Sequence, residues 1–347
     1  MKKLIKLFLV ACSLIVLVSC TNTEETSTAN NQISESTTTN NEISNYPLEI
    51  TNYKLPEGGG TPTEFTQIFE ESPKAILANN QTTGELLVEL GLKDSIVGVS
   101  AVFNEINPSI EKEFNSIPNI YTEYIPKEVA IGISPDIILG RSALFDNADW
   151  GVGTVDDLQA MDIHTYLLNA GKEDATIEDI FLDISEIGKI FDVEERATEF
   201  SNELRGELDN ITDSLSEETE SKTYVYCWSS DPEALSFISM SNGGLQNDAL
   251  SYLNLENAFP DVESDISLES LIGEDPDIIL YPVFSDTDIK EQIINNPKLA
   301  DLTAIQNDAV YPINYNYFFG YGHTTVDGIL ELGQLIYPDL LGEEIVG

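Results

Sequence analysis

The sequence is poor in positively charged residues. It contains 16 Lys and Arg against 61 Asp and Glu, which gives a formal net charge of −45 at pH 7, and its arginines are Arg141, Arg196 and Arg205. Nucleic acids and anionic membrane surfaces are polyanions that such a chain repels, so both are excluded as partners. An acidic surface also keeps a protein soluble, and we expect a monomer.

Histidine and cysteine are equally scarce, with two and three residues respectively. The sequence contains no Gly-x-Ser-x-Gly, no His-Glu-x-x-His and no phosphate-binding glycine loop, so these signatures of hydrolases and nucleotide-binding enzymes are absent. Metal catalysis would have to depend on carboxylates alone. We therefore predict that the protein is not an enzyme and holds no resident metal or cofactor.

The apolar run at Leu7–Val18 is too short to cross a bilayer as a helix, and a basic segment precedes it, as in a signal peptide. It ends in Leu-Val-Ser-Cys20, which resembles the lipobox of bacterial lipoproteins. The resemblance implies a signal peptide at 1–19, cleavage before Cys20 and diacylglycerol on its sulfur, so a lipid anchor outside the cytoplasm is the only membrane contact. Cys12 leaves with the signal peptide, so Cys227 has no disulfide partner and is predicted to be buried.

The segment after Cys20 consists mainly of Thr, Asn, Ser and Glu. Such a composition cannot bury enough surface to offset chain entropy, so we predict a disordered tether that, with the lipidated Cys20, spans 20–55. The glycines at 58–60 are either a second flexible stretch or the turn of a hairpin between Ile50–Tyr53 and Glu64–Ile68.

One twelve-residue motif occurs twice, at Glu128–Leu139 and Glu269–Leu280. Eight of the twelve positions agree, at a constant offset of 141 residues. Each copy reads as a short helical turn that begins with Glu, ends near Gly, and is followed by Pro-Asp and a buried Ile-Ile-Leu strand. Helix, turn and buried strand form half of a parallel βαβ unit, so the chain is predicted to contain two similar α/β lobes.

Strands and helices alternate on both sides of a long helical segment. We predict an N-terminal lobe at 56–192, a linker helix at 193–215 and a C-terminal lobe at 216–347. The fold class is therefore α/β, with two Rossmann-like lobes built on parallel-type sheets, joined by a long helix, and with a ligand cleft between them.

The order of several motifs over 73–341 resembles the iron-siderophore and vitamin B12 class of substrate-binding proteins of bacterial ABC importers. These motifs are Lys74–Asn79, Gly84–Ser100, the two repeat copies, Leu245–Leu250, Asn254–Phe259, Asn296–Leu299 and Leu335–Leu340. The resemblance implies a linker helix that limits hinge motion, and partnership with an ABC permease dimer and its ATPase. It also implies that Glu128 and Glu269 each meet basic residues of one permease subunit.

Open parallel sheets bind ligands at the carboxyl ends of their strands, so the cleft should be lined by strand-end loops. Arg141 directly follows a strand and can pair with an anionic ligand. Aromatic residues clustered on these loops favour a large, flat or greasy ligand with polar edges. The predicted ligand-binding residues are Asn80, Gln81, Phe103, Tyr121, Tyr124, Arg141, Phe145, Trp228, Ser241, Asn242, Phe284, Tyr315, Tyr317 and His323.

Both histidines have more than one interpretation. His323 stands where the resembling proteins often carry Gly-x-Arg, which weakens the case for a strongly anionic ligand. It could bind a metal, donate a hydrogen bond or be structural, whereas His164 lies in an apolar strand and is interpreted as core.

The leading hypothesis is a lipoprotein that captures a metal chelate, a ferric siderophore, and delivers it to a permease. A cobalamin or haem receptor is the alternative within the class. Two alternatives of other classes are a secreted enzyme that uses an Asp/Glu pair, and a surface adhesion protein that has lost transport.

Overall fold

The computed structural model describes residues 45–215, 220–229, 235–263, 265–283 and 288–342. The predicted signal peptide, Cys20 and most of the predicted tether lie outside these ranges, as does Phe284. Within them, every helix is either too short or too polar to span a bilayer.

The N-terminal lobe is built on a parallel sheet with the strand order β4-β3-β5-β6. The two central strands are buried at every position, because helices cover both faces of the sheet. The strands are β3 (Ile76–Ala78), β4 (Ile96–Val99), β5 (Ile137–Gly140) and β6 (His164–Leu167). The helices are α1 (Gln81–Glu89), α2 (Glu111–Phe114), α3 (Lys127–Gly132), α4 (Val155–Gln159) and α5 (Ile177–Ile190), with short 3₁₀ turns at Lys93–Ser95, Ser142–Leu144 and Asn169–Gly171.

The C-terminal lobe repeats this order. Strand β10 pairs in parallel with β11 and β7, and the other edge of β7 pairs with β9 in parallel and with β8 in antiparallel fashion. The strands are β7 (Lys222–Cys227), β8 (Phe237–Ile238), β9 (Leu255–Asn257), β10 (Ile278–Val283) and β11 (Val310–Asn314). The helices are α7 (Gly244–Ser251), α8 (Leu268–Glu274), α9 (Lys290–Ile294), α10 (Thr303–Gln306), α11 (Tyr315–Phe319), α12 (Thr324–Ile336) and α13 (Pro338–Leu341).

The aspartate of the repeat has the same structural role in both lobes. The Asp136 carboxylate accepts the backbone N–H groups of Lys74 and Ala75, at 2.9 and 3.0 Å, just before β3. The Asp277 carboxylate accepts the N–H and hydroxyl of Thr223 in β7, at 2.8 and 3.0 Å. Each aspartate therefore links the start of the strand that follows the repeat, β5 or β10, to the first strand of its parallel sheet, β3 or β7.

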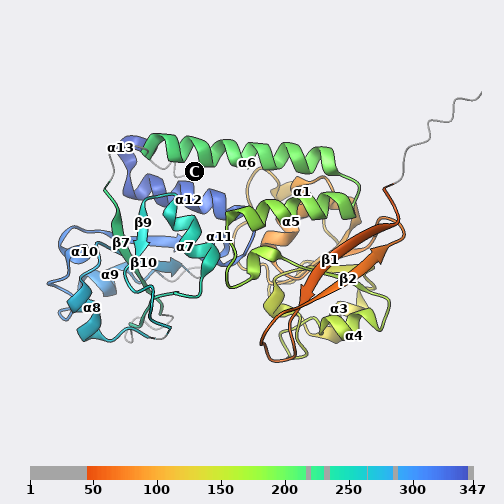
Figure 1. The fold of residues 1–347 in the computed structure, drawn as a ribbon, viewed down its shortest axis with the longest axis horizontal. Helices are drawn as coiled ribbons and strands as arrows, with labels where there is room; N and C mark the ends of the chain where they lie inside the picture. Colours follow the sequence, from red (N-terminus) through yellow and green to blue (C-terminus); the bar gives the residue numbers. More distant parts are fainter. Residues whose placement is uncertain (1–44, 216–219, 230–234, 264, 284–287, 343–347) are drawn as a thin grey trace, which may run out of the picture. The chain divides into compact units, whose positions relative to one another are not determined.

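Helix α6 (Glu194–Leu215) joins the lobes and falls within the range predicted for the linker (Figure 1). Its buried residues recur at three- and four-residue spacing, from Ala197 to Leu215, and it packs on α5 of one lobe and on α12 and α13 of the other. Gly206 lies midway along the helix, and a Cβ added there would meet nothing within 4 Å.

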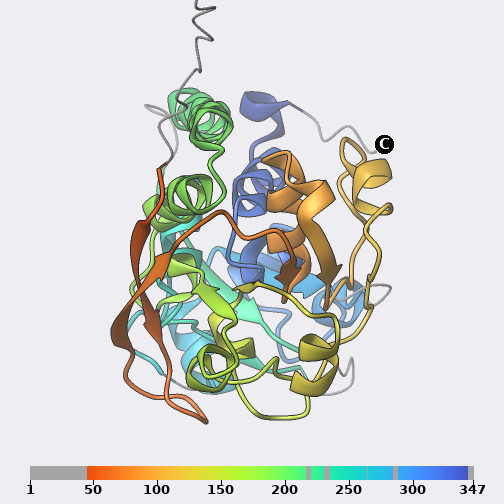
Figure 2. The same ribbon diagram turned by 90° about the vertical axis from the view of Figure 1, so that its right-hand side faces the viewer.

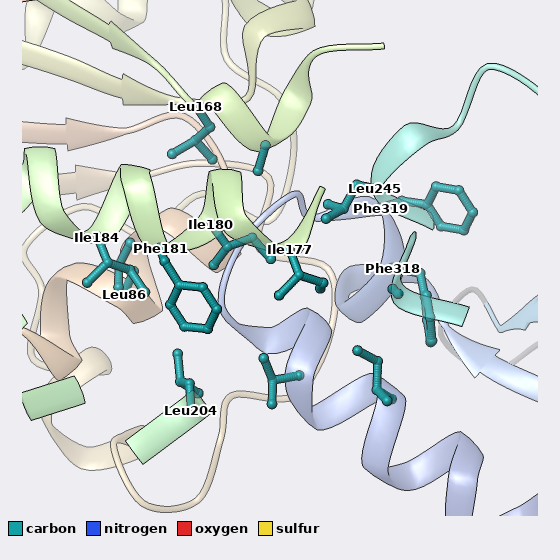
Figure 3. Close-up of a cluster of buried hydrophobic side chains, with 14 of the residues drawn as sticks. Leu86, Leu168, Ile177, Ile180, Phe181, Ile184, Leu204, Leu245, Phe318 and Phe319 are labelled. Atoms are coloured by element: carbon teal, nitrogen blue, oxygen red, sulfur yellow. The ribbon is translucent and has the colours of Figure 1, made fainter. Parts of the chain in front are cut away.

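One hydrophobic core continues across the junction of the lobes. Figure 3 shows Ile180 and Phe181 of α5 and Leu204 of α6 in the same cluster as Leu245 of α7 and Phe318 of α11. Because these side chains come from both lobes and the linker, the lobes share buried surface and are not merely tethered.

An antiparallel hairpin, β1 (Leu48–Lys54) and β2 (Thr63–Phe69), lies against the β6 edge of the N-terminal sheet (Figure 2). Its side chains make the contact: the Asn52 amide bonds both the O and the N–H of Leu167 at 3.0 Å, and the Tyr53 hydroxyl donates to Leu168 O at 2.7 Å. The glycines at 58–60 thus belong to a hairpin turn. Strand β1 lies inside the segment assigned to the tether, so the boundary predicted at residue 55 is too late.

Candidate functional site

The sharp turn after β5 positions Arg141. Gly140 has φ +138°, and a Cβ there would come within 2.0 Å of Asn79 Oδ1, so only glycine permits this approach. Asn79 then holds the next peptide from both sides: its Oδ1 accepts the Arg141 N–H at 2.8 Å and its Nδ2 donates to Arg141 O at 3.1 Å. The arginine side chain consequently leaves the sheet at its carboxyl edge.

The Arg141 guanidinium lies among tyrosines of the other lobe. Its Nη1 donates to the Tyr315 hydroxyl at 3.4 Å, and its Cζ lies 5.2 Å from the centroid of the Tyr321 ring. Tyr321 has a left-handed φ of 56°, a backbone conformation that a non-glycine residue rarely adopts. Strained residues of this kind cluster at binding sites. Within the described ranges, the buried Arg141 Nε has no hydrogen-bond partner and the guanidinium forms no ion pair.

Aromatic rings continue the site on either side of Arg141. On the C-terminal lobe, the Phe319 ring stacks on Tyr315 at 5.3 Å and meets Trp228 edge-on at 4.9 Å. On the N-terminal lobe, the Phe103 and Tyr124 rings meet edge-on at 5.2 Å, and both are more than a third exposed. Burial raises the pKa of Tyr124, and Tyr315 adds to the shift, so the Tyr124 phenol is a neutral donor at pH 7.

Two cavities adjoin this cluster, and both are lined by residues of the two lobes. A cavity of about 360 Å³ lies between the turn at 171–173 and the 239–244 segment, with Ser241, Asn242 and Tyr321 in its wall. A cavity of about 570 Å³ lies between the 103–108 loop and β11, with Phe103 and Tyr317 in its wall. Both volumes fall in the range of small-molecule sites.

Asn80 and Gln81 were predicted to touch ligand, but both are buried and hold the fold together. The Asn80 amide donates to Gly320 O at 3.1 Å and so links the lobes. Gln81 Oε1 accepts the N–H groups of Phe103 and Asn104, at 3.1 and 3.0 Å. Gln81 therefore shapes the loop that presents Phe103 and does not itself reach the cleft.

Phe145, Tyr121 and His323 also lie away from the aromatic cluster. Phe145 is buried in the core of the N-terminal lobe, and the partly buried Tyr121 packs against that core. His323 is buried beside Phe200 of α6, with ring centroids 5.4 Å apart, and burial lowers its pKa to about 4. The imidazole is therefore neutral at pH 7 and packs beside the linker helix, next to Tyr321 in the wall of a small cavity.

Several lining residues were missed by sequence reasoning. Lys172 and Met240 line the smaller cavity, and Lys172 Nζ lies 4.8 Å from the centroid of the Tyr53 ring. Lys172 follows β6 closely, so the strand-end argument that found Arg141 could have found it. No comparable signal marks Met240. In the described part of the chain, no three His, Cys, Asp or Glu side chains are grouped to hold a metal ion.

The two glutamates of the repeat lie on the short helices α3 and α8, each in the first turn, and both are exposed. Apolar side chains are exposed beside them: Val129 at 36%, Leu268 at 38% and Ile272 at 51%. Each lobe therefore exposes one carboxylate next to apolar surface, at the equivalent position of its fold.

Comparison with known proteins supports this architecture. The sequence profile of the family described as "Periplasmic binding protein" matches residues 76–317. The ABC transporter substrate-binding lipoprotein YvrC of Bacillus subtilis is 21% identical over 281 residues, which cover 79% of this chain and 83% of that protein.

Solved structures share the fold. A periplasmic binding protein from Veillonella parvula has a TM-score of 0.73 at 21% identity, over 84% of this chain and 98% of that one. A structure from the ABC-type Fe3+-hydroxamate transport system of Saccharomonospora viridis has a TM-score of 0.65 at 21% identity, over 84% and 99%. The periplasmic haem-binding protein RhuT of Roseiflexus has a TM-score of 0.60 at 17% identity, over 77% and 99%. The predicted α/β fold is confirmed.

Proposed function

The chain belongs to the periplasmic binding protein family as a substrate-binding protein of an ABC transporter, and we propose that its ligand is an anionic ferric siderophore. The family is not enzymatic, so the secreted-enzyme hypothesis is dropped. The observation that carries the proposal is the guanidinium of Arg141, held without a carboxylate partner between aromatic rings.

The charge balance of the molecule makes Arg141 informative. Arg196 pairs with Glu89 and Glu203, and Arg205 pairs with Glu178 at 2.6 Å. In a chain with a net charge of −45, carboxylates are available almost everywhere. An arginine that has none among the described residues, and lies at the carboxyl edge of a parallel sheet, favours an anionic ligand as its partner.

The aromatic rings favour a ligand with a broad apolar surface around its charged or metal-bound centre. Phe103, Tyr124, Tyr315 and Trp228 offer ring faces that cover apolar surface, and the polar tips of the two tyrosines and the tryptophan can also donate hydrogen bonds. A ferric chelate with an organic backbone has both properties. The likeness to a structure from an Fe3+-hydroxamate transport system supports a ferric chelate as the ligand, and the proposed negative charge rests on Arg141 alone, because three hydroxamates balance the charge of Fe3+.

Haem is the second candidate, and the tyrosines favour it. Haem iron takes His, Cys, Met or Tyr as an axial ligand. His323 is buried away from the cleft, so the axial ligand would be a tyrosine such as Tyr315 or Tyr321. Cobalamin, the other alternative, needs no cationic partner in the protein. Arg141 then has no assigned role.

For delivery, we propose that Glu128 and Glu269 dock on the two subunits of the permease. The support is positional: both carboxylates are exposed at the same address of the two lobes, on helices that leave the binding cleft free. Charge pairs at an interface rim set orientation and association rate, and desolvated pairs also add affinity.

We further propose that Cys20 carries the lipid that holds the receptor at the membrane. The relative YvrC is named a lipoprotein, and the sequence before Cys20 has the lipobox pattern. A Cys20→Ala variant should lose membrane fractionation completely. If it still fractionates with membranes in a strain that lacks the transporter, the anchor is elsewhere.

The ligand is tested by titrating the purified protein with a ferric hydroxamate, a ferric carboxylate chelate, haemin and cobalamin. Visible spectra report the chelate, and tryptophan emission reports the cleft, because the chain has two tryptophans and only Trp228 lies in the aromatic cluster. A Trp150→Phe variant should keep the quenching and a Trp228→Phe variant should lose it.

The ferric siderophore proposal expects saturable quenching by a ferric chelate, weakened in Arg141→Ala. Saturable binding of haemin with a shifted Soret band, and none of the siderophores, assigns the haem function instead. Binding of cobalamin that is insensitive to Arg141→Ala rejects both.

A further inference from the structure

Lys172 lies in the wall of the smaller cavity, the one of about 360 Å³, and is half-buried there. Its Nζ donates to Asn169 Oδ1 at 2.6 Å and lies 4.8 Å from the centroid of the Tyr53 ring. An amide oxygen and a ring face are both neutral partners. They hold the ammonium group in place without balancing its charge, so that charge remains available to a ligand.

The lack of a carboxylate partner for Lys172 is not explained by a shortage of carboxylates. Three exposed acids line the same cavity, and they are Glu173, Glu263 and Asp265. In the described part of the chain, the Lys172 ammonium forms an ion pair with none of them, whereas Lys127 pairs with Asp157 at 2.7 Å. Exposed charges are screened by water and salt, and a half-buried cation keeps more of its field.

The partner of Lys172 is itself fixed by a buried carboxylate on α5. Asn169 Nδ2 donates to Asp183 Oδ1 at 2.9 Å and to the Tyr166 hydroxyl at 3.1 Å, which turns Asn169 Oδ1 toward Lys172. Asp183 is 2% exposed, and its carboxylate also accepts the backbone N–H groups of Asn169 and Ala170, at 2.8 and 3.0 Å. A buried carboxylate is costly unless such bonds satisfy it. Asp183 therefore holds the turn after β6 from which Lys172 projects.

The C-terminal lobe packs directly on this turn. The Gly244 N–H donates to Glu173 O at 3.0 Å, and a Cβ on Gly244 would come within 2.5 Å of that oxygen, so the two backbones touch where only glycine fits. Met240, in the same segment, has a left-handed φ of 52° and lines the cavity. This contact fixes the spacing of the two cavity walls next to Lys172.

The turn that carries Lys172 also adjoins the turn that carries Arg141. Strands β5 and β6 are parallel neighbours, so their carboxyl ends lie side by side. A Cβ on Gly171 would lie 3.1 Å from the Oγ of Ser142, the residue after Arg141. Tyr321, whose ring lies 5.2 Å from the Arg141 guanidinium carbon, lines the cavity of Lys172. Two cations that lack a carboxylate partner among the described residues are therefore set at adjacent strand ends.

We propose that Lys172 is a second cationic contact of the ligand, and that the chelate carries two separated anionic groups, one for Arg141 and one for the smaller cavity. This inference rests on the proposed function, because it assumes that a chelate occupies the cleft. It narrows the ligand to a chelate with free carboxylates or other anionic oxygens away from the metal. Asn169 and Asp183 are positioning residues, since they act through Lys172.

Replacing Lys172 by Met tests the contact, because the change removes the charge and keeps most of the length of the side chain. Tryptophan quenching is titrated with a ferric chelate that has two free carboxylates and with a neutral ferric tris-hydroxamate. Lys172→Met should weaken the carboxylate chelate by about 10- to 150-fold, the range for a charged hydrogen bond, and leave the affinity for the neutral chelate unchanged. Lys172→Arg should retain binding of both.

Lys112 provides the matched control, because it is exposed on α2 and outside the cavity wall. Lys112→Met removes the same formal charge and should change neither affinity. Acetylation by an amine-directed reagent, read by mass spectrometry, adds a measurement on the wild type. The carboxylate chelate should slow the reaction at Lys172 and not at Lys112.

The positioning role is tested with Asn169→Ala, which keeps the ammonium charge and removes its acceptor. Affinity for the carboxylate chelate should fall, though less than in Lys172→Met, and affinity for the neutral chelate should not change. An equal loss for both chelates would show that Asn169 supports the lobe in general and does not position Lys172.

The failure of this inference differs from the failure of the proposed function. If Arg141→Ala weakens the carboxylate chelate and Lys172→Met does not, the proposed function stands and the second contact is overturned. Binding of the neutral chelate alone overturns it too. If Lys172→Met tightens a chelate that carries a free amine, the cavity holds a cation through its carboxylates, and the inference is wrong.

If no ferric chelate binds, the proposed function fails, and citrate without iron becomes the probe of the cavity. A rise in melting temperature with citrate that Lys172→Met abolishes and Lys112→Met keeps would preserve Lys172 as an anion contact. No rise in the wild type, or an equal rise in Lys172→Met, overturns that contact as well.

Discussion

The two lobes share one scaffold and differ at the ends of their strands. Strands β5 and β10 begin at equivalent residues, Ile137 and Ile278, and the residue before each Pro-Asp, Ser134 or Asp275, has a left-handed φ of 59° or 51°. Strand β5 then stops at Gly140 and releases Arg141, whereas β10 continues to Val283. The position equivalent to Arg141 lies inside β10 and is a proline.

The positions that the two lobes share stabilise their sheets, whereas the residues that differ lie in the strand-end loops of the proposed ligand site. The N-terminal lobe contributes the cation of the site, and the C-terminal lobe contributes most of the stacked rings. Meanwhile the residues that build each sheet, and the glutamates of α3 and α8, are kept in both. Duplicated positions stabilise the fold and carry the proposed docking, and unique strand-end residues carry the proposed ligand contacts.

The proposed docking function should break most severely when both glutamates are removed. A Glu128→Ala, Glu269→Ala double variant should lose about 2–5 kcal/mol of docking free energy for each desolvated pair, and whole-cell uptake should fall more than in either single variant. Chelate affinity should stay at the wild-type level. Glu64→Ala with Glu111→Ala, both exposed and outside the repeat, is the control pair. Normal uptake by the double variant would falsify docking through these residues.

The division of labour in the cleft is tested at Arg141. Arg141→Ala should weaken an anionic chelate by about 1.5–3 kcal/mol, because a charged hydrogen bond is lost, and should affect cobalamin less. Arg141→Lys keeps the charge without the bidentate fork, so its affinity for an anionic chelate should lie between the affinities of the wild type and of Arg141→Ala. Titration by tryptophan quenching measures the affinity of the wild type and of both variants. Unchanged affinity for every ligand would remove Arg141 from the site.

The equivalence of the scaffolds is tested at the repeat aspartates. Asp136→Ala and Asp277→Ala should each cost about 0.5–1.5 kcal/mol of unfolding free energy, because each removes the acceptor of two donors in or just before the neighbouring strand. The Asn variants keep one acceptor oxygen and should cost less. Chemical denaturation measures the four variants, and a cost confined to one lobe would show that the repeat is similar in sequence but not in energetics.

The smallest effect is expected at the apolar surface beside Glu269. Leu268 and Ile272 are exposed on α8, where α3 exposes Val129. Replacing both with Ser should lower uptake slightly, through a loss of under about 1 kcal/mol of docking free energy, since most interface side chains outside hot spots contribute little. Val129→Ser should have a weaker effect still. A larger loss than for Glu269→Ala would identify α8 as an apolar rather than an electrostatic docking site.

The scaffold was predictable because its signals are local and periodic. Pro-Asp followed by Ile-Ile-Leu predicts a buried strand in each lobe, and the spacing of Phe200, Leu204 and Leu208 predicts a helix, α6. The hairpin was the weakest part, because β1 has polar residues on its exposed face and is stabilised by side-chain bonds to β6 that no local pattern reveals.

The site was only partly predictable, because a strand-end residue can point either into the cleft or into the core. Helix α1 begins at Gln81, which turns the Gln81 amide toward the 103–104 backbone. Phe145 follows a 3₁₀ turn that directs its ring into the N-terminal core. Both outcomes depend on turn geometry set by distant residues. Arg141 is likewise held by a distant residue, Asn79, but its place directly after a predicted strand was enough to predict it.

Gly206 affects how fast the two lobes can move relative to each other, because it lies in the helix that joins them. Helix α6 has 22 residues and, at about 1.5 Å per residue, is about 33 Å long, so any change in the angle between the lobes must flex it. A glycine midway along it, with no packing requirement, lowers the resistance to bending at that point. The lobes can then adjust by small excursions on the microsecond to millisecond scale, without unfolding a hinge. Ligand capture should accordingly follow a single exponential whose rate rises linearly with ligand concentration.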